Sequence, residues 1–383
     1  MSKIISMFNH KGGVSKTTTT FNIGWMLANR GHRVLMVDAD PQCNLTGVSL
    51  GLVNSWPPLD DLAQDAEDDQ AFDAAQDRTA DFFTANVDRT LYGALRPAFE
   101  SEPRLLEPVD CFEIAGRSGL FVLPGHLKVG EYDVSLSIAH EMSGSLLPLK
   151  NVPGAIHHLL RLTAEALDVD YVLVDMSPSL GSLNQNIVAT SDLLVVPTSP
   201  DFFSIMALRS LAEVLPRWQR WAQQASENPL LKTAAYAFPP PRFKLAGAVI
   251  QRYRLYRAPT EANPNGDPTR PFAEWIQRVS DSMTADFLPA MRAAGLLLPA
   301  EAYEAAGIDQ DGVLARVQEF NSLLPKSQEH QKPVFELTVA ELQQAGVVLE
   351  NSEKQVRSLY RLFDDLCDRL GRLSAVQGTA NDA

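Results

Sequence analysis

The chain contains 383 residues, of which 45% are hydrophobic and 21% charged, and its formal net charge is −14. This length and apolar fraction exclude a peptide-scale scaffold and wholesale disorder. Its three widely spaced cysteines exclude a disulfide framework and indicate a reducing compartment. No apolar stretch approaches the roughly 18 residues that span a bilayer, so we expect a soluble, cytoplasmic protein.

Six short apolar runs predict the strands of a sheet. They are continuous rather than alternating, as is typical when helices cover both faces of a parallel sheet. The runs are Lys3–Phe8, Arg33–Val37, Leu120–Leu123, Tyr171–Val174, Leu193–Val196 and Leu245–Ile250. Helical segments lie between them at Thr17–Asn29, Ile156–Leu167 and Ile205–Gln224. The alternation predicts one doubly wound α/β domain over residues 1–383, with a mostly parallel sheet.

Two insertions interrupt this alternation. Residues 54–115 are acidic, and between Asn54 and Glu113 the sequence holds 15 acidic residues and four arginines. A solvated helical or mobile segment and a partner-binding surface are both open for this insertion. Residues 258–320 start with a loop rich in proline and asparagine. We expect helices at Phe272–Phe287 and Glu301–Phe320 in this second insertion, and a disordered tail over 374–383.

The segment Lys11–Thr18, KGGVSKTT, follows the first predicted strand and opens the first predicted helix. In this setting glycines let backbone N–H groups surround phosphate oxygens, and the helix N-terminus adds positive potential. Lys16 is placed to bridge the β- and γ-phosphates of a nucleotide, and Thr17 to complete the coordination of Mg²⁺. Ser15, directly before the lysine, requires ordinary backbone angles there.

Three carboxylates end predicted strands. Asp38 and Asp40 follow the run at Arg33–Val37, and Asp175 follows Tyr171–Val174. Ligands in open α/β sheets bind at the carboxyl ends of strands, so these acids are candidates for the nucleotide site. Helix capping is the alternative for strand-end acids. The apolar run ending in Asp175 is similar to a Walker B motif, so we expect this carboxylate to hold Mg²⁺ directly or through water.

With these motifs the chain resembles the ParA/MinD ATPases, a P-loop NTPase family with a deviant Walker A loop. The distinguishing feature is the second lysine, Lys11, which the resemblance implies crosses a dimer interface to the ATP of the partner subunit. It further implies that Asp38 lies near the Mg²⁺ shell and that Asp40 orients the attacking water. The residues expected to contact the nucleotide are Lys11, Gly12, Gly13, Val14, Ser15, Lys16, Thr17 and Thr18, with Pro200 and Asp201 near the base.

The resemblance covers residues 1–50, 115–255 and 320–373. In it, Gly247–Arg252 matches a base-side strand, and Leu324–Phe335 matches the last strand and loop. It implies ATP and Mg²⁺ as cofactors, a homodimer in the ATP state and slow hydrolysis stimulated by a ParB-like or cargo-adaptor protein. It also implies nonspecific DNA binding and a nucleoid-associated location, with the segregation or positioning of a DNA or other cargo as the function.

Candidate DNA contacts follow the sixth predicted strand. Arg252, Arg254 and Arg257 alternate with two tyrosines, and either a solvated edge or a contact with DNA phosphates explains this pattern. The last helical stretch, Glu353–Leu373, has an apolar and a basic face. A closing helix packed on the sheet is favoured for it, then DNA contact, and a membrane anchor is least favoured because the chain's end is polar.

Two other functions stay open. An ATP-gated interaction switch with little turnover could use the two insertions as docking surfaces. A MinD-like positioning ATPase would bind membranes. The histidines and remaining acids show no metal-ligand spacing, and Asn184, after the third carboxylate, is assigned no role.

Overall fold

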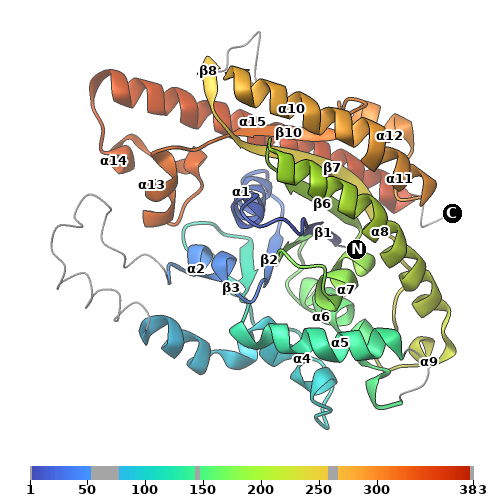
Figure 1. Ribbon diagram of the computed structural model, residues 1–383. Helices are drawn as coiled ribbons and strands as arrows, with labels where there is room; N and C mark the ends of the chain where they lie inside the picture. Colours follow the sequence, from blue (N-terminus) through green and yellow to red (C-terminus); the bar gives the residue numbers. More distant parts are fainter. Residues whose placement is uncertain (1, 53–76, 143–146, 258–265, 380–383) are drawn as a thin grey trace.

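An eight-stranded sheet runs through the molecule (Figure 1). The computed structural model describes residues 2–52, 77–142, 147–257 and 266–379. The strand order is β10-β7-β6-β1-β5-β2-β4-β3, and all neighbours are parallel except β3 and β4. The strands are β1 Lys3–Met7, β2 Val34–Ala39, β3 Phe112–Glu113, β4 Leu120–Leu123, β5 Tyr171–Met176, β6 Leu193–Thr198, β7 Lys244–Tyr253 and β10 Val313–Gln318; β8 Leu255–Arg257 and β9 Asp267–Pro268 form a separate pair.

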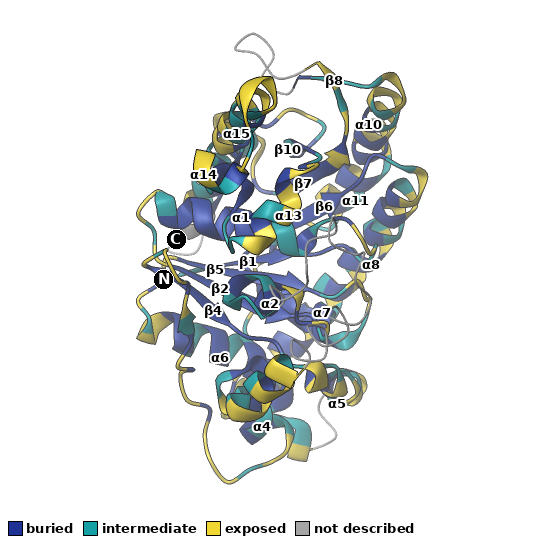
Figure 2. Ribbon diagram, turned by 90° about the vertical axis from the view of Figure 1, so that its left-hand side faces the viewer, coloured by how far each residue is buried: buried dark blue, intermediate teal, exposed yellow. Residues whose placement is uncertain are grey.

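Helices cover both faces of this sheet, which confirms the predicted α/β architecture (Figure 2). One face carries α1 Lys16–Asn29, α2 Asn44–Leu50, α12 Ala300–Ala305, α13 Leu323–Glu329, α14 Val339–Leu342 and α15 Gly346–Thr379. The other carries α4 Leu91–Phe99, α5 Glu131–Glu141, α6 Val152–Ala166, α7 Ser182–Thr190, α8 Phe202–Glu227, α10 Arg270–Ser282 and α11 Leu288–Ala293. Shorter elements are α9 Pro229–Lys232, η2 Val87–Arg89, η3 Leu127–Gly130, η4 Leu147–Leu149, η5 Met283–Phe287 and η6 Val334–Glu336.

The side chains of β5 show how the sheet separates two apolar cores. Val172 and Val174 join the core beneath α4–α8, whereas Leu173 joins the core beneath α1 and α15. This alternation follows from the two-residue period of a strand, and both cores require apolar residues. Leu173 is fully buried, so replacing it with alanine should cost about 2–5 kcal/mol of stability.

The first insertion packs against the core domain, so it is not simply the solvated helical or mobile segment that the sequence left open. Its residues 54–76 lie outside the described part, and residues 77–85 and α4 are helical. Leu91 and Leu95 of α4 are fully buried in the core shared with α6, since they fall four residues apart on one helix face. Phe112–Glu113 forms β3 at the edge of the main sheet. The insertion predicted over residues 54–115 therefore includes a strand of the core domain.

Within the second insertion, the helix predicted over Glu301–Phe320 is wrong beyond Ala305. Gly307, with φ of 65°, ends α12, and residues 313–318 form β10, which pairs in parallel with β7 at the sheet edge. Residues 258–265 lie outside the described part.

Two expectations near the end of the chain are also wrong. Because β10 already holds the edge position, the segment Leu324–Phe335 adds no strand and instead contains most of α13 and part of η6. Residues 374–379 are not a disordered tail but continue α15, where Val376 packs against the core; residues 380–383 are outside the described part. In the described residues, no helix has the length and apolarity to cross a bilayer.

Candidate nucleotide site

The phosphate loop, Lys11–Thr18, joins the carboxyl end of β1 to the first turn of α1. Gly13 has φ of 71° and Ser15 has φ of 56°, so both lie in the left-handed region. The expectation that Ser15 has ordinary backbone angles is therefore wrong. Its carbonyl accepts bonds from the N–H of Thr19 at 2.9 Å and from the hydroxyl of Thr19 at 2.7 Å, which fixes the start of the helix.

Lys16 lies inside this loop. Its ammonium donates to the carbonyl of Asn9 at 3.0 Å and to that of Lys11 at 3.2 Å. An ammonium has three donors, so one is left for a phosphate oxygen. Burial lowers the pKa of Lys16, and the nearby carboxylates of Asp175 and Asp40 oppose that shift.

The predicted metal-binding side chains meet at the ends of β2 and β5. Asp38 and Asp175 are register neighbours on these parallel strands, and both are buried. The Thr17 hydroxyl donates to Asp175 Oδ2 at 2.6 Å, which brings the first turn of α1 to the strand. Burial raises the pKa of Asp175 well above its usual range, and the charge of Asp38 adds to that shift.

Asp38 is held by Thr46 of α2. Its Oδ2 accepts from the backbone N–H of Thr46 at 2.8 Å and from the Thr46 hydroxyl at 2.7 Å. Burial raises its pKa to about 6, although the two bonds from Thr46 favour the charged form. The two threonines, Thr17 and Thr46, thus fix the orientation of the two carboxylates.

The donor set fits Mg²⁺ bound together with a nucleotide. Asp175 Oδ1 is buried and has no hydrogen-bond partner among the residues that the structure describes, a costly arrangement that a cation would relieve. Mg²⁺ prefers carboxylate and hydroxyl oxygens, and it commonly takes its other ligands from water and substrate phosphates. In the same described ranges, no group of three or more His, Cys, Asp or Glu side chains could hold a metal ion.

Asp40 lies beside this pair. Its N–H donates to Asp38 Oδ1 at 3.2 Å, and its own Oδ1 accepts from the N–H of Gln42 at 3.0 Å. The turn that follows β2 therefore fixes the direction of the Asp40 carboxylate. An acid held this way next to the phosphate loop can orient a water molecule.

Sequence reasoning missed the side chains that hold the loop after β5. The amide of Asn184 donates to the carbonyls of Ser177 at 2.9 Å and of Ser179 at 2.8 Å, so α7 clamps this loop. The first turn of α7 is capped from another helix, because Asp133 of α5 accepts from the N–H of Leu183 at 2.7 Å. The polar residue at 184 was visible in the sequence, whereas the capping by Asp133 depends on a contact across 50 residues.

Lys11 points to the start of α8 rather than into its own phosphate loop. Its ammonium contacts the carboxylate of Asp201 and donates to the hydroxyl of Ser204 at 3.0 Å. Asp201 also caps α8, since its Oδ1 accepts from the N–H of Ser204 at 2.9 Å. A hollow of about 470 Å³ opens here, lined by Lys11, Gly12, Gly13, Pro200, Asp201 and Arg252 among others.

The three candidate DNA-binding arginines separate in the structure. Arg252 donates to the carbonyl of Gly13 at 2.8 Å and thereby supports the phosphate loop. Arg254 pairs with Glu319 at 3.0 Å, and Arg257 lies 3.8 Å from Asp267. The structure therefore brings Arg252 to the nucleotide site and gives the other two acidic partners.

Comparisons with known proteins identify relatives of this chain. The AAA domain family matches residues 2–227. The sporulation initiation inhibitor Soj of Bacillus subtilis is 29% identical over 55% of this chain and 64% of its own length. The chromosome partitioning protein ParA of Caulobacter vibrioides is 28% identical over 56% of this chain and 62% of its own length.

An uncharacterized protein of Mycobacterium tuberculosis is 30% identical over 56% of this chain, which spans only 52% of that relative. The chain thus spans about half to two thirds of these relatives. Among solved structures, an ATP complex of a McdA variant from Cyanothece matches 97% of this chain and 96% of its own, with a TM-score of 0.53 and 16% identity. At that identity the match concerns the fold alone.

Proposed function

We propose that this chain, which belongs to the AAA domain family as a ParA/MinD-type ATPase, hydrolyses ATP slowly and uses ATP to form a dimer. The observation that carries the proposal is the meeting of Lys16, Thr17 and Asp175 at the phosphate loop. These groups supply a cation for the phosphates, a hydroxyl and a buried carboxylate with one oxygen to spare. Together they match what a bound nucleoside triphosphate with its metal requires.

In the proposed reaction, Lys16 neutralises the phosphate charge that builds up as the terminal phosphate leaves. Thr17 and Asp175 would hold Mg²⁺, with Asp38 beside Asp175 on the neighbouring strand. When bound, the ion would withdraw charge from the phosphate oxygens. Asp40 orients the attacking water, because its carboxylate is fixed by the N–H of Gln42.

The surface around Lys11 supports the proposed dimer. Phe202, Phe203 and Met206 at the start of α8 are exposed, and Phe203 is 70% exposed. Leu180, in the loop after β5, is exposed as well. These residues and Lys11 all follow carboxyl ends of parallel strands, so they lie at the same end of the sheet. Exposed apolar side chains gathered in this way are typical of a surface that another protein covers. A second copy of the chain on this surface would also bring its nucleotide to Lys11.

The finer parts of the proposal come from the relatives. The curated names of two of them refer to chromosome partitioning and to inhibition of sporulation initiation. We accordingly propose that the ATP dimer binds DNA without sequence preference, and that a ParB-like or cargo-adaptor protein stimulates hydrolysis and releases it.

An ATP turnover assay tests this function. The wild type should hydrolyse ATP only with Mg²⁺, and DNA should raise the rate. Lys16→Ala should lose ATP binding, whereas Asp40→Ala should bind ATP and lose turnover. Wild-type protein that binds no ATP, or an Asp40→Ala variant with normal turnover, would contradict the proposal.

A further inference from the structure

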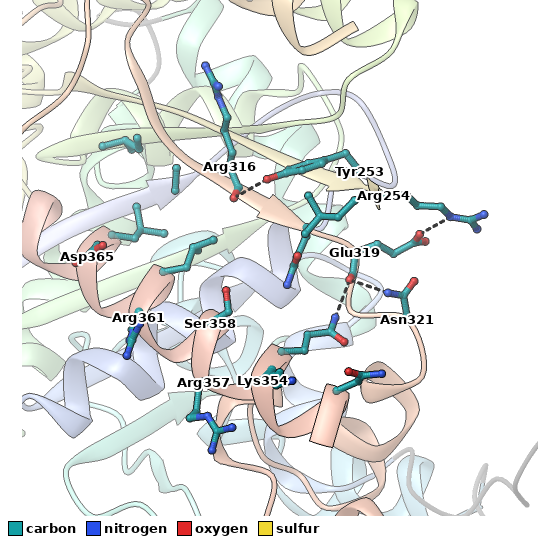
Figure 3. A pocket seen from close by; sticks show the side chains of 18 of the residues that line it. Tyr253, Arg254, Arg316, Glu319, Asn321, Lys354, Arg357, Ser358, Arg361 and Asp365 are labelled. Carbon is teal, nitrogen blue, oxygen red and sulfur yellow. Dashed lines mark hydrogen bonds and ion pairs between the residues drawn. The ribbon is translucent and has the colours of Figure 1, made fainter. Parts of the chain in front are cut away.

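A second hollow, of about 1060 Å³, lies between β10 and α15 (Figure 3). It adjoins the outer edge of the main sheet, because β10 is the last strand in the strand order. Its cationic side chains outnumber its acidic ones. The cations that line it are Arg254, Arg316, Lys354, Arg357, Arg361 and Arg369, and the acids are Glu319 and Asp365.

Three of these cations form a row along α15. Lys354, Arg357 and Arg361 are exposed and follow the helical spacing that puts residues on one face. None of the three makes an ion pair with another described residue, unlike Arg254 and Arg316, which pair with Glu319 at 3.0 Å and Asp311 at 3.5 Å. The chain as a whole is acidic, with a net charge of −14, so a row of unpaired cations beside a groove is a local exception. Such a row favours the binding of an anionic ligand.

The edge of β10 argues against an added peptide strand. The carbonyl of Leu314 accepts from the guanidinium of Arg369, and that of Arg316 accepts from the hydroxyl of Tyr253 at 3.2 Å. Directly after β10, the carbonyl of Glu319 accepts from Gln355 at 3.2 Å. Side chains thus already occupy acceptors that a pairing strand would need.

The spacing of the row suits a nucleic-acid backbone instead. Lys354 and Arg361 are seven positions apart, which is about 10 Å along a helix axis. One DNA strand presents a phosphate about every 3.4 Å of duplex axis, so the row can face successive phosphates. From these observations we infer that the groove between β10 and α15 binds the phosphate backbone of duplex DNA, through Lys354, Arg357 and Arg361.

This site deepens the DNA binding in the proposed function and rests on it. It also lies next to the nucleotide site, because Arg254 and Glu319 line both this groove and the hollow at Lys11. DNA in the groove therefore reaches an ion pair that borders the phosphate loop. Because Arg254 and Glu319 line both hollows, DNA bound in the groove and nucleotide bound at the phosphate loop can affect each other's binding.

Fluorescence anisotropy of a short labelled duplex of mixed sequence, titrated with the full chain in Mg-ATP at several salt concentrations, tests the inference. The triple variant Lys354→Gln, Arg357→Gln, Arg361→Gln should bind at least about tenfold more weakly, and its salt slope should be smaller by about 2–3. The matched control, Arg217→Gln, Arg220→Gln, Arg292→Gln, removes three exposed cations from α8 and α11, across the sheet, and should bind as the wild type does.

A further variant, Arg357→Lys with Arg361→Lys, keeps the charges and should retain binding, which separates charge from loss of fold. Wild-type affinity in the triple variant, no duplex binding by the wild type, or stronger displacement of the duplex by polyglutamate than by unlabelled duplex would overturn the inference. Failure of the ATP-dependent part of the proposed function has a different signature, since basal ATP turnover and dimerisation are measured without DNA.

Discussion

The ammonium of Lys11 contacts the carboxylate of Asp201 within the same subunit. This contact links the phosphate loop to the first turn of α8, which Asp201 also caps. The lysine expected to reach a partner's ATP is therefore held by its own chain. The proposed dimerisation through Lys11 would have to break this ion pair, so we expect the pair to oppose the dimer.

Asp201→Asn should strengthen the ATP-dependent dimer. Asparagine is as good a helix cap as aspartate, so the change removes the charge that holds Lys11 and keeps α8 intact. We expect the dimer dissociation constant in Mg-ATP to fall by about 5- to 10-fold, equal to about 1 kcal/mol for a partly exposed ion pair. Sedimentation equilibrium measures it. Unchanged or weaker dimerisation in this variant would show that the pair does not restrain Lys11.

Ser15→Gly should stabilise the protein. Ser15 has φ of 56° and its side chain makes no capping bond to α1, so glycine loses nothing there and tolerates the angle. Glycine relieves the unfavourable left-handed conformation, and its greater chain entropy in the unfolded state offsets part of that gain. The free energy of unfolding should therefore rise by about 0.5–1 kcal/mol. Urea unfolding measures this change. The control Ser15→Ala keeps the angle unfavourable and should be near neutral; stabilisation by alanine would point to another cause.

The stability of the nucleotide-free protein should depend on the proton of Asp38. Burial raises its pKa from 3.8 to about 6, so the folded chain holds this proton at higher pH than the unfolded chain. The stability from this group is complete below 3.8 and is lost as the pH rises through about 6. Relative to Asp38→Asn, the wild type should lose roughly 3 kcal/mol over that window.

Urea unfolding of both proteins at a series of pH values, without Mg²⁺ or nucleotide, checks this difference. Asparagine can still accept the two bonds from Thr46 but loses the bond from the N–H of Asp40. That loss does not vary with pH, so the pH dependence of the difference reports the ionisation. A stability difference that stays constant with pH would contradict the assigned cause.

Asn184→Ala should loosen the loop after β5. The variant loses the bonds to Ser177 and Ser179, which should cost about 1–3 kcal/mol and speed amide hydrogen exchange in residues 177–181. ATP turnover should fall as well, because this loop follows Asp175. The control Asn186→Ala lies on the same helix and bonds to Pro153 at 2.9 Å instead. It should destabilise the fold without changing exchange in the loop; equal exchange in both variants would remove the special role of Asn184.

The sequence predicted the parts of this molecule that depend on local patterns. The six apolar runs became strands, and KGGVSKTT became a loop between strand and helix, because continuous apolar runs and glycine spacing act over few residues. The sequence predicted that Lys16, Thr17, Asp38 and Asp175 lie at the carboxyl ends of strands. The structure adds the strand order β1-β5-β2, which makes these ends neighbours.

The features that sequence missed depend on distant contacts. β10 carries Arg316 at its centre and lies inside the helix predicted over Glu301–Phe320, since its pairing with β7 bridges more than 60 residues. Ser15 was expected to have ordinary backbone angles, whereas its φ is 56°. The Lys11–Asp201 pair joins residues 190 positions apart, and only the folded sheet brings them together.

The oligomeric state with and without Lys11 tests the central claim most directly. Sedimentation of the wild type with Mg²⁺ and a non-hydrolysable ATP analogue should give a dimer, and without nucleotide a monomer. Lys11→Ala should bind the analogue with unchanged affinity and stay monomeric. A wild type that stays monomeric when saturated with the analogue, or a Lys11→Ala variant that dimerises equally well, would contradict the account.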